Sequence, residues 1–237
     1  MGKVLIAMSG GVDSSVAAYL LKHSGWDCVG ATMTLYRNED IGISRSRTCC
    51  SLEDVEDARS VAFRLRIPYY VFNFSDEFRR QVMDRFADAY GQGRTPNPCI
   101  DCNRYLKFRH LYDRAVLLGC DAIATGHYAR IERENGRYLL KKALDASKDQ
   151  SYVLYMLTQK QLALTQFPLG ALRKAETRQL ADSLGFFNAR KPDSQDICFV
   201  PDGDYAAFIR RHSGKADTPG DFVDESGRIL GRHKGIA

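Results

Sequence analysis

Long hydrophobic runs are missing from this sequence of 237 residues. No apolar stretch approaches the roughly 20 residues that a membrane-spanning helix needs, so we expect no membrane partner. A secretory signal is missing as well, because residues 1–6 lead into a glycine-rich loop too early to form one. These absences predict a cytoplasmic protein.

A strong excess of charge of one sign is also missing. The net charge is +5, from 34 basic and 29 acidic residues. Such a mildly basic balance permits a nucleic-acid partner but does not by itself indicate one. No internal repeat or low-complexity tract is present, and 44% hydrophobic and 27% charged residues are ordinary values for a globular protein.

Two common nucleotide-binding motifs are absent: no Gly-Lys-Ser/Thr follows the first glycine pair, and there is no Gly-x-Gly-x-x-Gly. Residues 8–15, with the sequence MSGGVDSS, instead join the first predicted strand to the first predicted helix. Gly10 and Gly11 allow a ligand to approach the backbone closely. The helix N-terminus and the hydroxyls of Ser9, Ser14 and Ser15 offer donors to a phosphate group. This segment is therefore the first candidate binding site.

The cysteine count is odd, at seven, in a chain that is not small. In a reducing compartment such cysteines are more often catalytic, metal-binding or core residues than disulfide staples. Cys28 and Cys120 fall on apolar faces and are interpreted as core residues. Cys99 and Cys102 lie in a proline-rich loop before a predicted helix, whose N-terminus favours a thiolate. Cys198 lies in a later loop, and one cysteine carrying a terminal sulfur with a second to attack it is the minimal machinery for sulfur transfer.

Short apolar runs alternate with helical patterns in the first half of the chain. Strands are expected at residues 3–8, 28–35, 68–74 and 122–125, and helices at 13–23, 51–65, 75–90 and 103–118. This alternation predicts an α/β fold of the Rossmann-like, adenine nucleotide alpha-hydrolase type, with a parallel sheet covered on both faces. Ligands of such sheets bind at the carboxyl ends of the strands.

Three stretches are expected to be irregular, residues 37–50, 91–102 and 191–204. Irregular loops of this length in a compact domain are usually functional or disordered. A helix at 205–212 and two short strands around the turn at 225–227 follow. We expect a catalytic domain over residues 1–204 and the beginning of a second, truncated domain over 205–237.

The SGGVDSS segment, residues 9–15, resembles the signature of the N-type ATP pyrophosphatases. That resemblance implies that the loop grips the pyrophosphate of ATP, and that the enzyme adenylates a carbonyl-type oxygen of its substrate. Asp13 would then help to hold Mg²⁺, which neutralises the leaving pyrophosphate.

The chain as a whole resembles the bacterial tRNA-specific 2-thiouridylase family. The resemblance rests on these segments: SGGVDSS (9–15), CCSLEDVEDAR (49–59), GRTPNPC-x-x-CN (93–103), ATGHYA (124–129), SKDQSYVLY (147–155) and DICFVP (196–201). It implies a transferase that makes 2-thiouridine at the wobble position of tRNAs for Lys, Glu and Gln. ATP, Mg²⁺ and a persulfide donor, such as a cysteine desulfurase or a sulfur-relay protein, are implied with it.

The resemblance also implies roles for single residues. Cys102 would be the nucleophile and Cys198 the persulfide carrier, with a disulfide between them during turnover, and Gly126 would let the nucleotide lie against the backbone. The remaining implied contacts are Ala7, Met8, Ser9, Gly10, Gly11, Val12, Asp13 and Ser14 with ATP phosphates, Met33 with adenine, Asn97, Pro98 and Cys99 with the target base, and Lys148, Asp149 and Gln150 with tRNA.

Two departures from the family pattern bear on these roles. Some members carry an aspartate where this chain has Cys99. The chain also ends before the β-barrel that helps other members hold tRNA.

Three alternatives stay open. A lysidine synthetase or an amidotransferase-type synthetase shares the phosphate loop but needs no paired loop cysteines. Cys99, Cys102 and Cys198 are alternatively three ligands of an iron–sulfur cluster. The third alternative is a tRNA-binding fragment without turnover, with phosphates tracked by basic residues. Those residues are Arg104, Lys107, Arg109, Lys141, Lys142, Arg173, Lys174, Arg178, Arg210 and Arg211.

Overall fold

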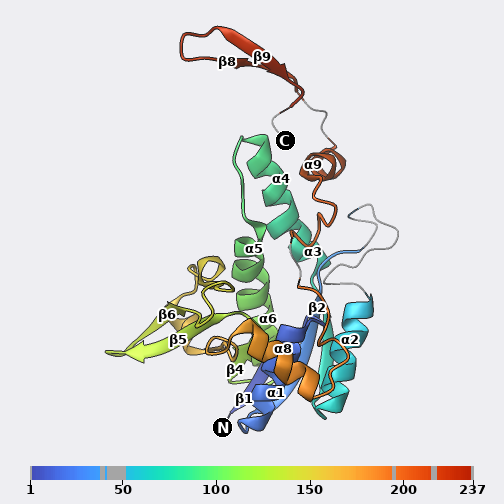
Figure 1. The fold of residues 1–237 in the computed structure, drawn as a ribbon, viewed down its shortest axis with the longest axis vertical. Helices are drawn as coiled ribbons and strands as arrows, with labels where there is room; N and C mark the ends of the chain where they lie inside the picture. Colours follow the sequence, from blue (N-terminus) through green and yellow to red (C-terminus); the bar gives the residue numbers. More distant parts are fainter. Residues whose placement is uncertain (1, 38–40, 42–51, 194–195, 215–217, 236–237) are drawn as a thin grey trace.

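A computed structural model of the chain describes residues 2–37, 41, 52–193, 196–214 and 218–235. Its centre is a five-stranded parallel sheet in the order β3-β2-β1-β4-β7 (Figure 1). The strands are β1 (Lys3–Ala7), β2 (Asp27–Thr34), β3 (Tyr69–Asn73), β4 (Ala122–Ala124) and β7 (Thr165–Gln166). The predicted parallel α/β sheet is confirmed, and four of its five strands lie where the apolar runs place them.

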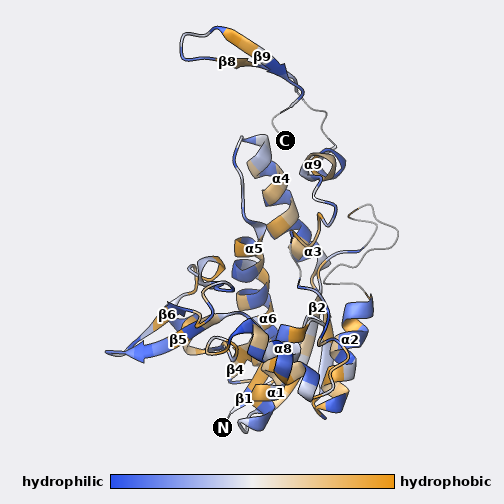
Figure 2. Ribbon diagram, in the orientation of Figure 1, coloured by the Kyte–Doolittle hydropathy of each residue, from blue (hydrophilic) through white to orange (hydrophobic). Residues whose placement is uncertain are grey.

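Alternate residues of β1 face opposite sides of the sheet, because side chains of a strand alternate between its two faces. Val4 and Ile6 belong to one core cluster, with residues of α1 (Val12–His23), α2 (Leu52–Arg64) and α8 (Lys174–Ser183). Leu5 belongs to the other cluster, with residues of the helices on the opposite face. Figure 2 shows the apolar strands enclosed between these two layers. The expectation of a sheet covered on both faces is therefore confirmed.

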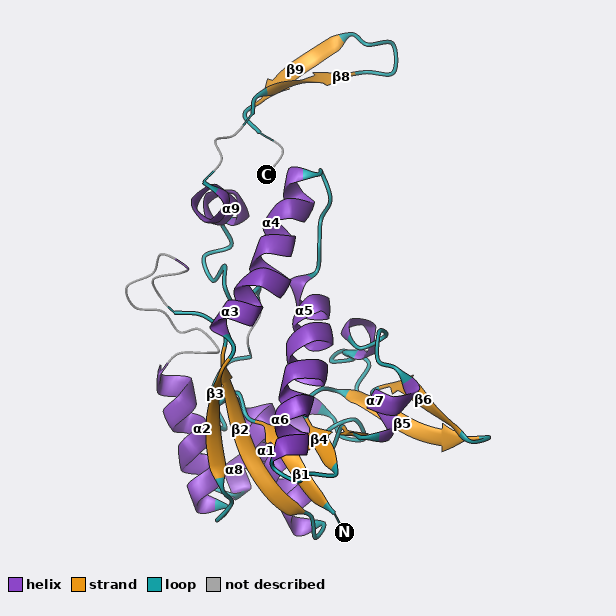
Figure 3. Cartoon of the chain, turned by 180° about the vertical axis from the view of Figure 1, so that it is seen from behind, coloured by secondary structure: helices purple, strands orange, loops and turns teal. Residues whose placement is uncertain are grey.

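Two long helices contribute side chains to the core cluster that contains Leu5. One runs through α3 (Ser75–Phe78), the π-helical segment η2 (Arg79–Met83) and α4 (Asp84–Gly91). The other runs through α5 (Pro98–Asp101), the π-helical segment η3 (Cys102–His110) and α6 (Leu111–Leu117), and is seen in front of the sheet in Figure 3.

The second of these helices begins earlier than predicted. Residues 98–102 were expected to be part of a loop, whereas the helix starts at Pro98. The Asn97 side chain accepts a hydrogen bond from the Cys99 amide at 3.0 Å, and Pro98 occupies the first helical position. An asparagine cap followed by proline is a regular helix start. Cys99 and Cys102 are thus helical residues.

An antiparallel hairpin interrupts the alternation, which the sequence analysis did not foresee. β5 (Ala129–Glu134) pairs with β6 (Arg137–Lys142) across Asn135 and Gly136, both at positive φ. Asn-Gly between two strand-like runs is a strong hairpin signal. A 3₁₀ turn η4 (Ser151–Val153) and the helix α7 (Gln159–Ala163) lie between this hairpin and β7.

The C-terminal elements are α9 (Tyr205–Ser213) and a hairpin of β8 (Gly220–Val223) and β9 (Ile229–His233), as the sequence predicts. Phe208 and Ile209 of α9 belong to the same core cluster as Leu5 of β1. The β8–β9 hairpin lies apart from the sheet in Figure 1. The domain boundary at residue 204 stays a prediction.

Candidate functional site

The phosphate-loop candidate lies where the sequence predicts, between β1 and α1. Gly10 has φ +76°, and a Cβ atom there would lie only 2.4 Å from the carbonyl oxygen of Asp54. Only glycine fits this position, since other residues are strained at this φ and would collide with α2. The loop is thereby packed directly against the first turn of α2.

A buried asparagine fixes the loop from the other side. Asn188 donates from Nδ2 to the Gly10 carbonyl and to the Ser15 hydroxyl, each at 2.9 Å. Ser15 is fully buried, and its hydroxyl donates to the Gly11 carbonyl at 3.0 Å. The expectation that Ser15 offers its hydroxyl to a phosphate is therefore wrong. Ser14, whose hydroxyl also donates to the Gly11 carbonyl, is buried as well.

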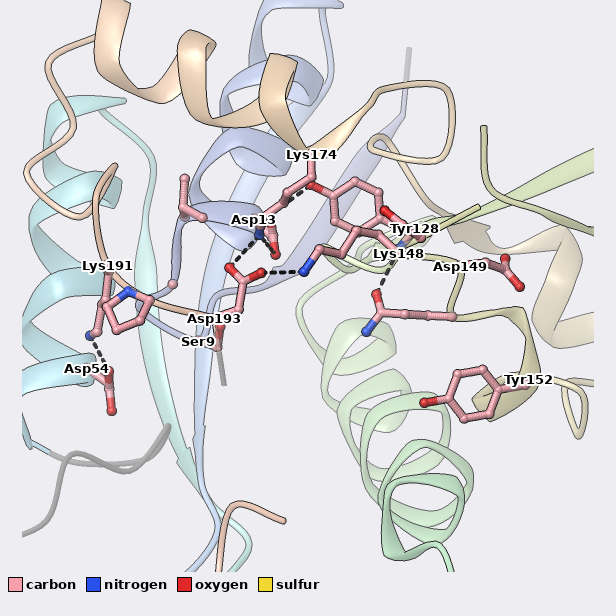
Figure 4. A pocket seen from close by; sticks show the side chains of 15 residues that line it. Ser9, Asp13, Asp54, Tyr128, Lys148, Asp149, Tyr152, Lys174, Lys191 and Asp193 are labelled. Atoms are coloured by element: carbon pink, nitrogen blue, oxygen red, sulfur yellow. Dashed lines mark hydrogen bonds and ion pairs between the residues drawn. The ribbon is translucent and has the colours of Figure 1, made fainter. Parts of the chain in front are cut away.

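A cavity of about 390 Å³ opens beside this loop (Figure 4). Four of the predicted phosphate-loop residues line it: Ser9, Gly11, Val12 and Asp13. The three residues predicted to contact tRNA, Lys148, Asp149 and Gln150, line it too. Other predicted residues are not among its lining: Ala7, Met8, Gly10, Ser14, Met33, Gly126, Asn97, Pro98, Cys99, Cys102 and Cys198. The structure thus brings together two segments that the sequence analysis assigned to different ligands.

Asp13 faces a lysine that the sequence analysis placed only among surface cations. Lys174 Nζ lies 2.8 and 2.7 Å from the two carboxylate oxygens of Asp13, and the lysine side chain is only 10% exposed. The Tyr128 hydroxyl donates to Asp13 Oδ1 at 2.9 Å. Burial raises the pKa of Tyr128, so this hydroxyl stays protonated and keeps donating. Asp13 is held in one orientation at the cavity wall.

Asp193 is a second anion that lies among these cations. It accepts from Lys174, Lys148 and Arg178 at 2.7, 2.9 and 2.7 Å. Burial alone would raise the pKa of Asp193, but the hydrogen bonds from Lys174 and Lys148 outweigh it and lower the pKa to about 2. Figure 4 shows Asp193 between Lys148 and Lys174 in the cavity. Three cations thus converge on one carboxylate, an arrangement that also suits phosphate oxygens.

This pKa predicts how stability depends on pH. An aspartate with a pKa lowered on folding stabilises the folded state above its unfolded pKa of about 3.9, and this contribution disappears as pH falls through the folded pKa. The unfolding free energy of wild type is therefore expected to fall between about pH 4 and pH 2, and about 2 kcal/mol of this fall should be missing when Asp193 is removed. Urea titrations of wild type and Asp193→Asn across this range measure it. Parallel pH profiles of the two proteins would contradict it.

The opposite wall of the cavity carries another ion pair. Lys191 bonds to Asp54 and lies 2.7 Å from Asp57, so it joins the last irregular stretch to α2. In all, the lining includes three lysines and four aspartates. Such a wall supplies cations for phosphate groups and carboxylate oxygens for a divalent metal ion.

Asp149 and Gln150 shape their own loop. Asp149 accepts from the amides of Ala143 and Ser151 and from the Ser151 hydroxyl, the last at 2.7 Å. Gln150 exchanges two hydrogen bonds of 2.9 Å with the backbone of Tyr128, one from its amide and one to its side-chain oxygen. Tyr128 therefore joins this loop to Asp13.

Gly126 packs against the start of α1. A Cβ atom at Gly126 would lie 2.9 Å from both the Asp13 carbonyl carbon and the Ser14 amide nitrogen. This contact gives a packing reason for glycine, beside the predicted approach of the nucleotide.

Gly126→Ala is accordingly expected to displace the first turn of α1, to lower the unfolding free energy by about 1–3 kcal/mol and to weaken ATP binding. Thermal unfolding and ATP titration measure the two effects. Gly91→Ala is the matched control, because nothing lies within 4 Å of the Cβ that it adds. Equal behaviour of the two variants would refute the packing argument.

Two of the three sulfur-chemistry candidates pack against the same core cluster, whereas Cys99 is exposed. Cys102 and Cys198 both pack against the cluster that contains Leu106 and Phe199. The Tyr36 hydroxyl donates to the Cys198 carbonyl at 2.6 Å. Cys99, not Cys102, occupies the first helical turn, where the helix dipole acts most strongly. Cys28 is buried, which raises its pKa to about 11, so the thiol stays protonated; Cys120 is partly buried, also with a raised pKa.

Within the described ranges, no three His, Cys, Asp or Glu side chains come together as a metal site. Cys99, Cys102 and Cys198 are all described, so they do not form a ready set of iron–sulfur ligands. The same ranges contain no helix long and apolar enough to cross a membrane. Cys49 and Cys50 lie outside the described residues.

Comparisons with known proteins match nearly the whole chain. The family model described as tRNA methyl transferase HUP domain matches residues 2–202. The tRNA-specific 2-thiouridylase MnmA of Lachnoclostridium phytofermentans is 55% identical over 238 residues, which cover 100% of this chain and 67% of that protein. The protein of the same name from Clostridioides difficile is 53% identical over 236 residues, covering 99% of this chain and 65% of its own. The chain thus spans about two thirds of the length of these relatives.

One solved structure, a 4-thiouridine synthetase–RNA complex with bound ATP, matches with a TM-score of 0.57 and 22% identity. The match covers 84% of this chain and 45% of that one, and it supports the fold. Family model and relatives together cover nearly every residue of the chain, so the chain belongs to the tRNA-specific 2-thiouridylase family.

Proposed function

We propose that this protein uses ATP to replace the O2 oxygen of a tRNA wobble uridine by sulfur, in tRNAs of the Lys, Glu and Gln types. The observation that carries the proposal is the shared cavity, which is lined both by the phosphate loop and by residues 148–150. A nucleotide phosphate and an RNA must meet for adenylation, and a cavity lined both by the phosphate loop and by the predicted tRNA contacts supports this. The relatives described above are named tRNA-specific 2-thiouridylases, which supports 2-thiolation of tRNA as the reaction.

In the first step, the uracil O2 attacks the α-phosphorus of ATP and pyrophosphate leaves. The loop residues Ser9 and Gly11 would bind the phosphates. Lys174, whose Nζ lies 2.7–2.8 Å from the Asp13 oxygens, would compensate the negative charge of the phosphates. The carboxylate of Asp13 lines the cavity, which suits it to Mg²⁺. The metal ion would supply charge neutralisation for the departing pyrophosphate.

In the second step, the terminal sulfur of a Cys198 persulfide bonds to C2, and AMP leaves with the C2–O electron pair. The Cys102 thiolate then attacks the inner sulfur of Cys198 and breaks the persulfide bond, which leaves sulfur on the base. The resulting Cys102–Cys198 disulfide must be reduced by an external thiol before the next cycle. A persulfide donor protein, such as a cysteine desulfurase or a relay protein, would reload Cys198.

Mass spectrometry of tRNA nucleosides tests this function. The full-length protein is incubated with unmodified tRNA, ATP, Mg²⁺ and a persulfide source, and 2-thiouridine is expected only when all four are present. A lysidine or amide product without sulfur would move the chain to another ATP pyrophosphatase activity. RNA binding without any product would support the binding-fragment alternative.

A further inference from the structure

Two large aromatic side chains just after residue 150 are exposed, and one of them lies at the cavity. Tyr152 is 61% exposed and Tyr155 is 64% exposed. Tyr152 also lines the cavity, and Figure 4 shows its ring on the side away from Lys191 and Asp54. An exposed aromatic at a polar cavity has no packing role that explains its position, so its face is available to a ligand.

The turn that carries Tyr152 is held rigidly. Asp149 caps the turn through the Ser151 hydroxyl at 2.7 Å, and the Val153 amide donates to the Gln150 carbonyl at 3.2 Å. Buried Asn103 donates from Nδ2 to the Val153 carbonyl at 3.2 Å. Since Asn103 follows Cys102 in the helix, Tyr152 lies on a turn that is fixed both to the phosphate-loop side and to the Cys102 helix.

Basic and aromatic groups also lie together at the helix that contains Cys102 and Asn103. The guanidinium groups of Arg85 and Arg104 lie 5.3 and 5.9 Å from the ring centre of Tyr105. A hydrogen bond with the Tyr105 side chain raises the pKa of Arg104, so this guanidinium stays charged. Aromatic faces interleaved with arginine are the surface on which unpaired RNA bases stack.

We propose that Tyr152 is the stacking platform for the target uracil. This inference rests on the proposed function and names the side chain that would hold the RNA base at the cavity. Stacking uses the whole ring face, so the Tyr152 hydroxyl is dispensable for it.

The test is binding of a fluorescent RNA hairpin whose loop carries one uridine, compared with the same hairpin made abasic at that uridine. Wild type is expected to bind the uridine hairpin roughly five- to 150-fold more tightly, the range that corresponds to one stacked base. Tyr152→Ala is expected to bind both hairpins equally, whereas Tyr152→Phe keeps the wild-type preference. Phe63→Ala removes an aromatic that is 85% exposed on α2, and serves as the matched control.

The outcomes separate the two proposals. Equal preference for the uridine hairpin in Tyr152→Ala and wild type overturns the stacking proposal and leaves thiolation standing. No RNA binding by wild type overturns the proposed function itself. Folding of Tyr152→Ala is established by an unchanged thermal unfolding midpoint, and Tyr152→Leu, which also lacks the ring, serves as the second variant if the alanine form fails to fold. Loss of the preference in Tyr152→Phe would show that the hydroxyl, not the ring face, recognises the base.

Discussion

Asp13→Ala is expected to lower the rate of pyrophosphate release from ATP by a factor of about 10²–10³ or more. The carboxylate is held at the cavity wall by Lys174 and Tyr128, so its charge is positioned before any ligand arrives. The buried ammonium of Lys174 loses one of its two carboxylate partners when Asp13 is removed and keeps Asp193. The substitution also removes the anionic group that would face the metal–pyrophosphate complex.

Pyrophosphate release, measured with tRNA and ATP in excess, reports this effect directly. Asp13→Asn keeps the shape of the side chain and separates charge from packing. Asp182→Ala is the matched control, because this aspartate of α8 is 57% exposed and its pair with Arg190 spans 3.7 Å. Full activity of Asp13→Ala would remove Asp13 from the site.

Cys198→Ser is expected to lose the protein persulfide, and Cys102→Ser to keep it while failing to thiolate tRNA. The reason is the division of labour between a sulfur carrier and an attacking thiolate, each of which needs its own sulfur atom. Both variants should fall to the background of the assay. Intact-protein mass spectrometry detects the persulfide, and nucleoside analysis detects the product.

Cys99→Asp distinguishes the two-cysteine mechanism from an iron–sulfur site. The mechanism predicts a mild effect, since Cys99 makes no bond to the transferred sulfur. A cluster predicts that Cys99→Asp lowers activity as much as Cys102→Ser does. It also predicts that substitution of Cys99, Cys102 or Cys198 abolishes the visible absorbance of anaerobically purified protein. Normal 2-thiouridine formation by Cys102→Ser, or turnover by Cys198→Ser, would refute the two-cysteine mechanism. Cys120→Ser is the control for thiol loss outside the site.

Local signals were enough to predict the parallel sheet and the position of its phosphate loop. Each strand from β1 to β4 is a short apolar run next to a helical pattern, and both signals lie within one segment of chain. Two local signals were overlooked, the Asn97–Pro98 helix start and the Asn135–Gly136 turn. Both follow ordinary capping and turn rules, so both were predictable from the sequence alone.

The cavity wall was beyond local signals. Lys174 meets Asp13 across 161 residues, and Asn188 meets Gly10 across 178. A lysine at a helix start can be buried against a carboxylate or point into solvent. The neighbouring sequence does not distinguish these two cases. The assignments of Lys148, Asp149 and Gln150 came from resemblance, and their place beside the phosphate loop required the fold.

Tyr128 has a consequence for how the two substrates influence each other. Its hydroxyl bonds to Asp13, while its backbone exchanges two hydrogen bonds with Gln150. A ligand that immobilises Asp13 therefore restrains Gln150, and a ligand on the Gln150 turn restrains Asp13. Binding energies linked in this way are reciprocal, so any factor by which ATP changes the affinity for RNA is also the factor by which RNA changes the affinity for ATP. The order in which they arrive alters the route to the ternary complex and leaves its stability the same.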